Sequence, residues 1–240
     1  MLKRRRLSTA SCRAQRGLSL VELMVGVAVG LVIVAGAALL VASQLGENRR
    51  LLLETQVQQD LRATADIVTR ELRRTGANSQ VLSLVWLSDA PTALPVMNQF
   101  ADIDLADPNV VVHYAYDRGG VPADNFYNYR LTNQTIRSQT GAGSPQDLTD
   151  RNTLRIAVAN SSAAGFTVQR TPLPTIQLAC PNLCPDGTQD CWPTLQLEDL
   201  EITISGQAAN DPAISRTVTS RVRVRNDAVR FNVSPTQVCP

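Results

Sequence analysis

Histidine is almost missing from this 240-residue sequence, which contains only His113. A multi-histidine metal site is therefore excluded, and a Ser-His-Asp or Cys-His arrangement would depend on this one residue. His113 lies in the run Val110–Tyr114, whose composition predicts a β-strand. We expect His113 to be a strand residue with a satisfied hydrogen bond, not a catalytic one. No cofactor and no enzymatic activity are predicted for the chain.

Aromatic residues are also scarce, at 4% of the chain, so stacking platforms for nucleic-acid bases are not expected. Acidic residues are absent from residues 1–17, which hold six of the 23 cations. Without these six, 17 basic residues face 21 acids, a formal charge of −4. The basic character belongs to a short N-terminal tail, and no nucleic-acid partner is predicted.

Charged side chains are absent from the twenty residues Leu23 to Ala42. A helix of that length spans about 30 Å, the thickness of a bilayer core. The six basic residues of positions 1–17 all precede this segment. The positive-inside rule therefore predicts a cytoplasmic N-terminus and a periplasmic remainder, anchored in the inner membrane. A secretory signal peptide typically has a shorter apolar stretch followed by a small-residue cleavage site. A single-pass anchor that is never cut is the remaining alternative.

The junction before this segment is Arg16-Gly17-Leu18-Ser19, with Glu22 just beyond. It resembles the type III signal of type IV prepilins, in which a basic leader ends in Gly and Glu is the fifth mature residue. The resemblance implies that prepilin peptidase cleaves after Gly17 and methylates the new amine of Leu18. It also implies that Glu22 neutralises the amine of a neighbouring subunit during assembly. Independently, a carboxylate at the edge of hydrocarbon indicates a functional residue. The sequence departs from the family in having Leu18 in place of the usual Phe, and no proline within the apolar helix.

Beyond the apolar segment, apolar residues continue to recur every three or four positions, as in a helix with one apolar stripe. The stripe consists of Leu53, Val57, Leu61, Ala65, Val68 and Leu72, and Gly76 is the predicted stop. The expected organisation is a cleaved leader (1–17), a hydrophobic transmembrane or filament-core helix (18–45), its amphipathic continuation (46–76) and a periplasmic head (77–240).

The head is expected to be rich in strands. The predicted strands are Val81–Leu87, Val110–Tyr116, Phe126–Leu131, Thr135–Ser138, Thr153–Ala159, Phe166–Arg170, Leu195–Ser205 and Ser215–Arg225. A tight hairpin with Thr132-Asn133 at its turn is predicted between the third and fourth of them. The fold class is therefore α+β: the type IV pilin fold, a long helix packed on an antiparallel sheet.

Three segments of this head resemble the larger minor pilins of the PilW type: Arg70–Gly76, Tyr129–Leu131 and Thr217–Asn226. The resemblance implies a structural subunit that helps initiate assembly at or near the tip of a type IV pilus. Its partners would be prepilin peptidase and other minor and major pilins. A J-type minor pseudopilin of type II secretion is the main alternative, followed by a DNA- or ligand-binding competence pilin and an uncut, anchored periplasmic enzyme.

Cys12 would leave with the leader, so four cysteines remain: Cys180, Cys184, Cys191 and Cys239. An even number in an oxidising compartment predicts two disulfides, with three connectivities open. A four-cysteine zinc site is the alternative, although the spacing is poor for a zinc ribbon.

Two groups of charged residues, an acidic loop and a row of arginines, each allow a structural and a functional interpretation. Asp102, Asp104 and Asp107 form an acidic loop, which we expect to be solvated, because it lacks the Gly and terminal Glu of a calcium-binding EF-hand loop. Arg221, Arg223 and Arg225 alternate with valines along one predicted strand. We expect an edge strand protected by charge, with a partner surface as the alternative.

Overall fold

The computed structural model describes residues 17, 19–79, 98–107, 110–119, 122–157 and 165–230. The chain divides into two compact units, the first ending at Arg49 and the second beginning at Arg50. Helix α1 (Leu20–Leu72) supplies most of the described part of the first unit and the first element of the second. The predicted strand Val81–Leu87 lies outside the described residues.

In the second unit, α1 buries one stripe of side chains, as its periodicity predicts. Val57, Leu61, Ala65, Val68 and Leu72 are buried, and Leu53 is partly buried against the same core. The helix ends at Leu72, and Gly76 follows with a φ of 78°, a conformation that glycine adopts without strain. The predicted helical stripe and its stop near Gly76 are both confirmed.

In the described part of this unit, the strands form three antiparallel sheets. Sheet A has the order β1 (Val112–Ala115), β2 (Phe126–Thr132), β3 (Thr135–Thr140), β4 (Gln146–Asp147), and a 3₁₀ turn, η2 (Pro122–Asn125), precedes β2. Sheet B has the order β10 (Ser215–Arg223), β9 (Asp199–Ala208), β5 (Leu154–Ile156), and β6 (Phe166–Thr171) also pairs with β9. Sheet C has the order β11 (Ala228–Arg230), β8 (Thr194–Gln196), β7 (Ile176–Gln177).

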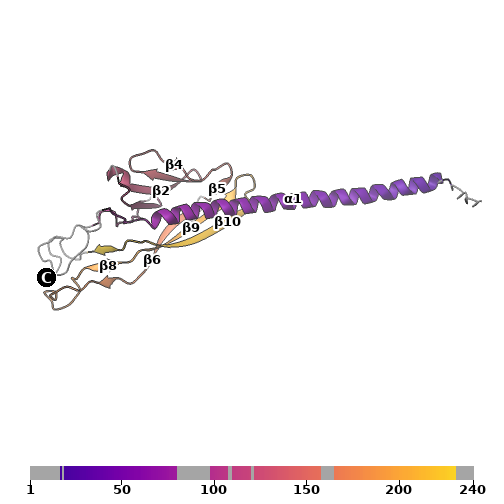
Figure 1. Cartoon of the computed structure of the whole chain (residues 1–240). Coiled ribbons are helices and arrows are strands. Elements are labelled where there is room, and N and C mark those ends of the chain that lie inside the picture. Colours follow the sequence, from indigo (N-terminus) through magenta and orange to yellow (C-terminus); the bar gives the residue numbers. More distant parts are fainter. Residues whose placement is uncertain are drawn as a thin grey trace, which may run out of the picture. The chain divides into compact units, whose positions relative to one another are not determined.

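Sheets A and B share one hydrophobic core with the C-terminal half of α1 (Figure 1). Gly206 of β9 lies at this contact, because a Cβ there would come within 2.7 Å of Leu154 and 3.2 Å of Leu61. Burial of such apolar side chains is the main stabilising contribution to a domain of this kind. The α+β fold predicted from the sequence is confirmed.

Two details of the strand predictions are wrong. The β2–β3 hairpin turns at Asn133 and Gln134, both with positive φ, and Thr132 pairs with Thr135 across the ladder. The turn therefore lies one residue later than predicted, because asparagine tolerates positive φ better than β-branched threonine. The single strand predicted from Leu195 to Ser205 is two strands, β8 and β9, which belong to different sheets.

Candidate functional site: the N-terminal assembly helix and its head

The residues predicted as a processing and assembly site lie just before α1 and in its first turn. Gly17 is exposed, and a Cβ added there would meet no atom within 4 Å. The carbonyl of Ser19 accepts the first helical hydrogen bond, from the Leu23 amide at 3.1 Å. Glu22 is exposed in this turn, where the helix dipole favours negative charge. Leu18 lies outside the described residues.

The helix that follows is apolar on every side and buries nothing within the described chain. Its leucines and valines are more than half exposed, for example 73% at Leu39. It is the one described helix that is long and apolar enough to cross a membrane. Exposed apolar surface on this scale requires cover from lipid or protein. The N-terminal half of α1 is therefore the surface through which the chain meets an apolar environment.

Two glutamates connect the second half of α1 to the rest of the head. Glu54 pairs with Arg50 at 3.3 Å and with Arg216 of β10 at 2.5 Å. Glu71 accepts a hydrogen bond from the Tyr116 hydroxyl at 2.5 Å. Neither role was predicted, because these partners are 162 and 45 residues away along the chain. The sequence gives one indication of these contacts: Glu54 and Glu71 are each adjacent to a residue of the apolar stripe.

All four tyrosines of the chain stack together: Tyr114, Tyr127 and Tyr129 in sheet A, and Tyr116 just after β1. Ring centroids are 4.5 Å apart for Tyr116 and Tyr127, and 5.4 and 5.5 Å apart from Tyr114 to Tyr127 and Tyr129. Burial raises the pKa of Tyr129 to about 12 and raises the pKa values of Tyr114 and Tyr116 further. These hydroxyls stay neutral throughout the physiological range and serve the packing of the head.

The cysteine cluster contains a disulfide between Cys184 and Cys191, whose Cα atoms are 5.8 Å apart. Cys180 is disulfide-bonded as well, and Cys239 lies outside the described residues. Of the three connectivities, the Cys184–Cys191 bond leaves Cys180–Cys239 as the predicted second pair. It is also incompatible with a four-cysteine zinc site, which needs every sulfur as a thiolate.

The three acids of the loop at 102–107 engage different groups of the head. Asp107 lies 3.1 Å from Nε2 of His113, Asp104 forms a backbone bridge with His113, and Asp102 pairs with Arg230. His113 is in β1 with a hydrogen-bond partner, as predicted. Within the described residues, no three His, Cys, Asp or Glu side chains are grouped as metal ligands.

The arginines of β10 are largely used within the head. Arg221 pairs with Glu201, its register partner in β9, at 2.8 Å, and Arg223 pairs with Asp227 at 3.4 Å. Among the described strands β10 pairs only with β9, so it is an edge strand of sheet B. This agrees with the expectation of a charged, protected edge.

These features define a class of protein. Residues 12–38 match the prokaryotic N-terminal methylation motif, which covers Gly17, Leu18, Glu22 and most of the apolar helix. A long apolar N-terminal helix joined to antiparallel sheets is the α+β type IV pilin fold, and the chain is a type IV pilin-like prepilin.

The head identifies the family more closely. Residues 50–224, which are 175 of the 240, match the model of prepilin peptidase-dependent protein B, and the chain belongs to this family. The family's description and the motif together imply dependence on prepilin peptidase. No curated protein and no solved structure matches the sequence.

Proposed function

We propose that this chain is a minor pilin of a type IV pilus, most like the PilW type, which helps initiate assembly at or near the pilus tip. The observation that carries the proposal is the exposed apolar half of α1, which begins at Leu20, two residues after Leu18. Pilin-like families consist of structural, non-enzymatic subunits. The head supplies a folded body for such a subunit.

In the proposed mechanism, the chain inserts with its N-terminus in the cytoplasm and its head in the periplasm. Prepilin peptidase removes residues 1–17 and methylates Leu18. The helix of residues 18–45 then leaves the lipid for the filament core, an exchange between two apolar surroundings. Glu22 neutralises the amine of an adjacent subunit, because an unpaired charge among apolar helices is costly. Residues 46–76 and 77–240 remain together as the head.

The same N-terminal element would serve a J-type minor pseudopilin, so the test must separate the two. We would measure the intact mass of the membrane form, then probe sheared filaments by immunoblot in strains with and without the gene. The expected result is loss of the 17-residue leader with one added methyl group, presence in the pilus fraction, and fewer pili without the gene. A mature form beginning at Met1 contradicts processing. Normal piliation combined with impaired protein secretion supports the pseudopilin instead.

A further inference from the structure

The connection between β7 and β8 carries three of the chain's five cysteines, Cys180, Cys184 and Cys191. The two strands pair as an antiparallel hairpin, and the Leu178 amide extends the pairing by donating to the Pro193 carbonyl at 2.8 Å. Among the described residues, none from this hairpin belongs to the hydrophobic core that α1 shares with sheets A and B. That core therefore does not impose the conformation of the connection.

The residues between Cys184 and Cys191 form a tight turn, the cysteine turn, which brings the two sulfurs together. The Cys184 amide donates to the Thr188 carbonyl at 3.0 Å, and the Gly187 amide donates to the Cys184 carbonyl at 2.8 Å. Gly187 has a φ of 76°, which glycine adopts without strain. The Asp186 carboxylate accepts hydrogen bonds from the Thr188 amide at 3.0 Å and from the Thr188 hydroxyl at 2.7 Å. The Cys191 amide then donates to Sγ of Cys184 at 3.0 Å, beside the disulfide.

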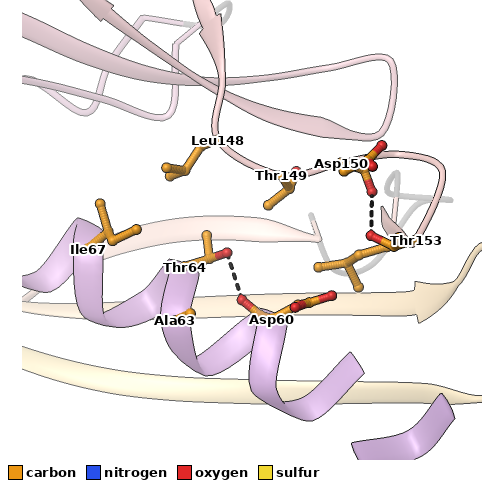
Figure 2. Close-up of a pocket in the computed structure, with 9 residues that line it drawn as sticks. Asp60, Ala63, Thr64, Ile67, Leu148, Thr149, Asp150 and Thr153 are labelled. Atoms are coloured by element: carbon orange, nitrogen blue, oxygen red, sulfur yellow. Dashed lines mark hydrogen bonds between the residues drawn. The ribbon is translucent and has the colours of Figure 1, made fainter. Parts of the chain in front are cut away.

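The turn at Asp150 shows by contrast why the cysteine turn can form on its own. Asp150 also makes local hydrogen bonds: its carboxylate accepts the Asn152 amide at 2.8 Å, and its carbonyl accepts the Thr153 hydroxyl (Figure 2). However, Figure 2 shows this turn facing α1, with which it lines a groove. Of residues 184–190, in contrast, only Cys184 is buried. The conformation of the cysteine turn is therefore determined by its own sequence, and the turn can form before the head is complete.

Loop length alone would favour a different disulfide. Cys180 lies four residues before Cys184, whereas Cys191 lies seven residues after it. Loop-closure entropy favours the shorter of these two loops by about twofold. Cys180 and Cys184 are also the first two cysteines of the cluster along the chain. The structure contains the longer loop, so the folding of the cysteine turn, and not the loop length, accounts for the pairing.

The remaining cysteine of the cluster has its partner much further along the chain. Cys180 is disulfide-bonded, and Cys239 is its predicted partner by elimination. Cys239 follows 59 positions later, beyond strands β8 to β11. The cysteine turn is complete at residue 191, so Cys180 is the one cysteine of the cluster that has to wait until position 239 has been exported.

We propose that the two disulfides form in a fixed order, in which the cysteine turn closes Cys184–Cys191 first. Cys180 then holds a mixed disulfide with a thiol oxidoreductase, a protein whose own active-site disulfide is the oxidant, until Cys239 arrives. The inference rests on the proposed function in one respect, which is that the head reaches an oxidising compartment.

The last pair closes in two exchange steps. The Cys180 thiolate attacks the disulfide of the oxidoreductase, forms the mixed disulfide and releases one thiolate of that protein. The Cys239 thiolate then attacks the Cys180 sulfur and releases the second thiolate. The two cysteines give up two electrons, the oxidoreductase is reduced to its dithiol, and the two protons pass through water to its sulfurs. The Cys184–Cys191 bond uses a separate oxidoreductase molecule in the same two steps.

The first test measures pairing in the full-length Cys239→Ser chain in detergent micelles, equilibrated with reduced and oxidised glutathione. After acid quenching and alkylation, cleavage before Asp190 separates Cys191 from the other two cysteines, and tandem mass spectrometry locates the alkylated cysteine. We expect Cys184–Cys191 to exceed Cys180–Cys184 roughly tenfold, which corresponds to about 1.4 kcal/mol from the hydrogen bonds of the turn.

Asp186→Ala/Thr188→Ala, added to this chain, removes the side-chain hydrogen bonds of the cysteine turn. The shorter loop should then predominate by about twofold, as loop length alone predicts. Gln189→Ala is the matched control, because Gln189 is exposed in the same turn and its side chain makes none of the turn's described hydrogen bonds. The control should keep the original preference. An unchanged preference in the Asp186/Thr188 variant, or an equal change in the control, contradicts the proposal.

The second test detects the mixed disulfide in cells. Cells that produce Cys239→Ser are quenched with acid, alkylated and analysed on non-reducing gels. We expect a reductant-sensitive adduct with one oxidoreductase, which mass spectrometry identifies as linked through Cys180. Cys184→Ser/Cys191→Ser/Cys239→Ser should keep the adduct, and Cys180→Ser/Cys239→Ser should lose it. No adduct, an adduct that survives the loss of Cys180, or dimers of this chain alone would contradict the mixed disulfide.

The two tests separate this inference from the proposed function. If the mature wild-type chain carries four thiols in cells, the head does not reach an oxidising compartment and the proposed function fails. The glutathione test requires no export, so it still decides whether the cysteine turn selects Cys184–Cys191.

Discussion

The two halves of α1 share one helical backbone but have opposite relations to the rest of the chain. From Leu20 to Arg49 no side chain is buried, whereas between Arg50 and Leu72 six are. The first half is apolar on all sides, and the second is apolar along one stripe. The stripe packs in the core of the head, and the all-round apolar surface is left for an apolar environment outside the head. If the proposed function holds, folding and assembly depend on separate stretches, and substitutions should affect one without the other.

Glu22→Ala should have the largest effect on assembly. Cleavage after Gly17 should continue, because the peptidase is expected to recognise mainly the glycine. Incorporation into filaments should be lost, because the amine of the adjacent subunit then has no counter-charge. Immunoblots of membrane and sheared fractions measure both steps. Glu47→Ala, an exposed glutamate further along the same half of α1, is the control and should assemble normally. Wild-type incorporation of the Glu22 variant would show that its carboxylate is dispensable.

Cys239→Ser should have the largest effect on the stability of the head. A disulfide from Cys180 to Cys239 closes a loop of about 60 residues, which the chain-entropy model values at about 4 kcal/mol. The variant should melt at a lower temperature in detergent and show one free thiol under denaturing conditions. Ser161→Ala, which changes no cysteine, is the control for the effect of substitution and purification, and it should melt like the wild type. Four titratable thiols in the unreduced mature wild-type protein would contradict both disulfides.

Leu61→Ala and Leu31→Ala compare the two halves of the helix directly. Leu61 is 0% exposed and Leu31 is 65% exposed. We expect Leu61→Ala to lower the free energy of unfolding of the head by about 3 kcal/mol, through lost burial and a residual cavity. Leu31→Ala should change it by less than about 0.5 kcal/mol. Denaturant titration of both full-length variants in detergent, followed by tryptophan fluorescence, measures the difference. Equal destabilisation would remove the distinction between the halves.

Gly206→Ala and Gly36→Ala make the same comparison with added volume. A Cβ at Gly206 would collide with Leu154 and press on Leu61, whereas nothing lies within 4 Å of one at Gly36. Overpacking of this kind typically costs about 1–3 kcal/mol. The same denaturant titration should therefore show destabilisation for Gly206→Ala alone. An unchanged midpoint for this variant would mean that β9 can move away from α1 freely.

The tyrosine stack predicts a smaller, pH-dependent effect that is confined to the head. The pKa values of Tyr114, Tyr116 and Tyr129 are raised by burial above 10, so their neutral forms stabilise the fold fully below pH 10. That contribution is lost as the pH rises from 10 toward 12 and beyond. Absorbance at 295 nm should show these tyrosines ionising together with loss of near-UV circular dichroism, while the far-UV helical signal of the apolar half persists. Ionisation near pH 10 without unfolding would contradict their burial.

Some structural elements of this protein can be predicted from local sequence patterns, and others cannot. The stripe at Val57, Leu61 and Val68 was predictable because a helix places residues three and four apart on one face. The break between β8 and β9 was not predictable, because the two strands pair with different and distant partners. Glu198 lies at this break, and its buried carboxylate is paired with Arg170, 28 residues earlier. The two-residue strands β4 and β7 were also missed, because their pairing partners and not their own sequences define them.

The candidate site divides in the same way. The junction from Gly17 to Glu22 is contiguous, so its residue types and spacing are visible in the sequence. The contact between the second half of α1 and β10 joins Glu54 to Arg216 across 162 positions, and neither residue is part of a recognisable sequence pattern.

Strand β9 has a consequence for the order of events during synthesis. It pairs with β5 and β6, which precede it, and with β10, which follows it, while β8 pairs with β11 at residues 228–230. A chain made from its N-terminus therefore cannot complete the part of the core that sheet B contributes until nearly all of the head has been synthesised. Pairings of such long range form slowly. The head should remain open and sensitive to protease until β10 is available, so a factor that holds the nascent chain would act during this interval.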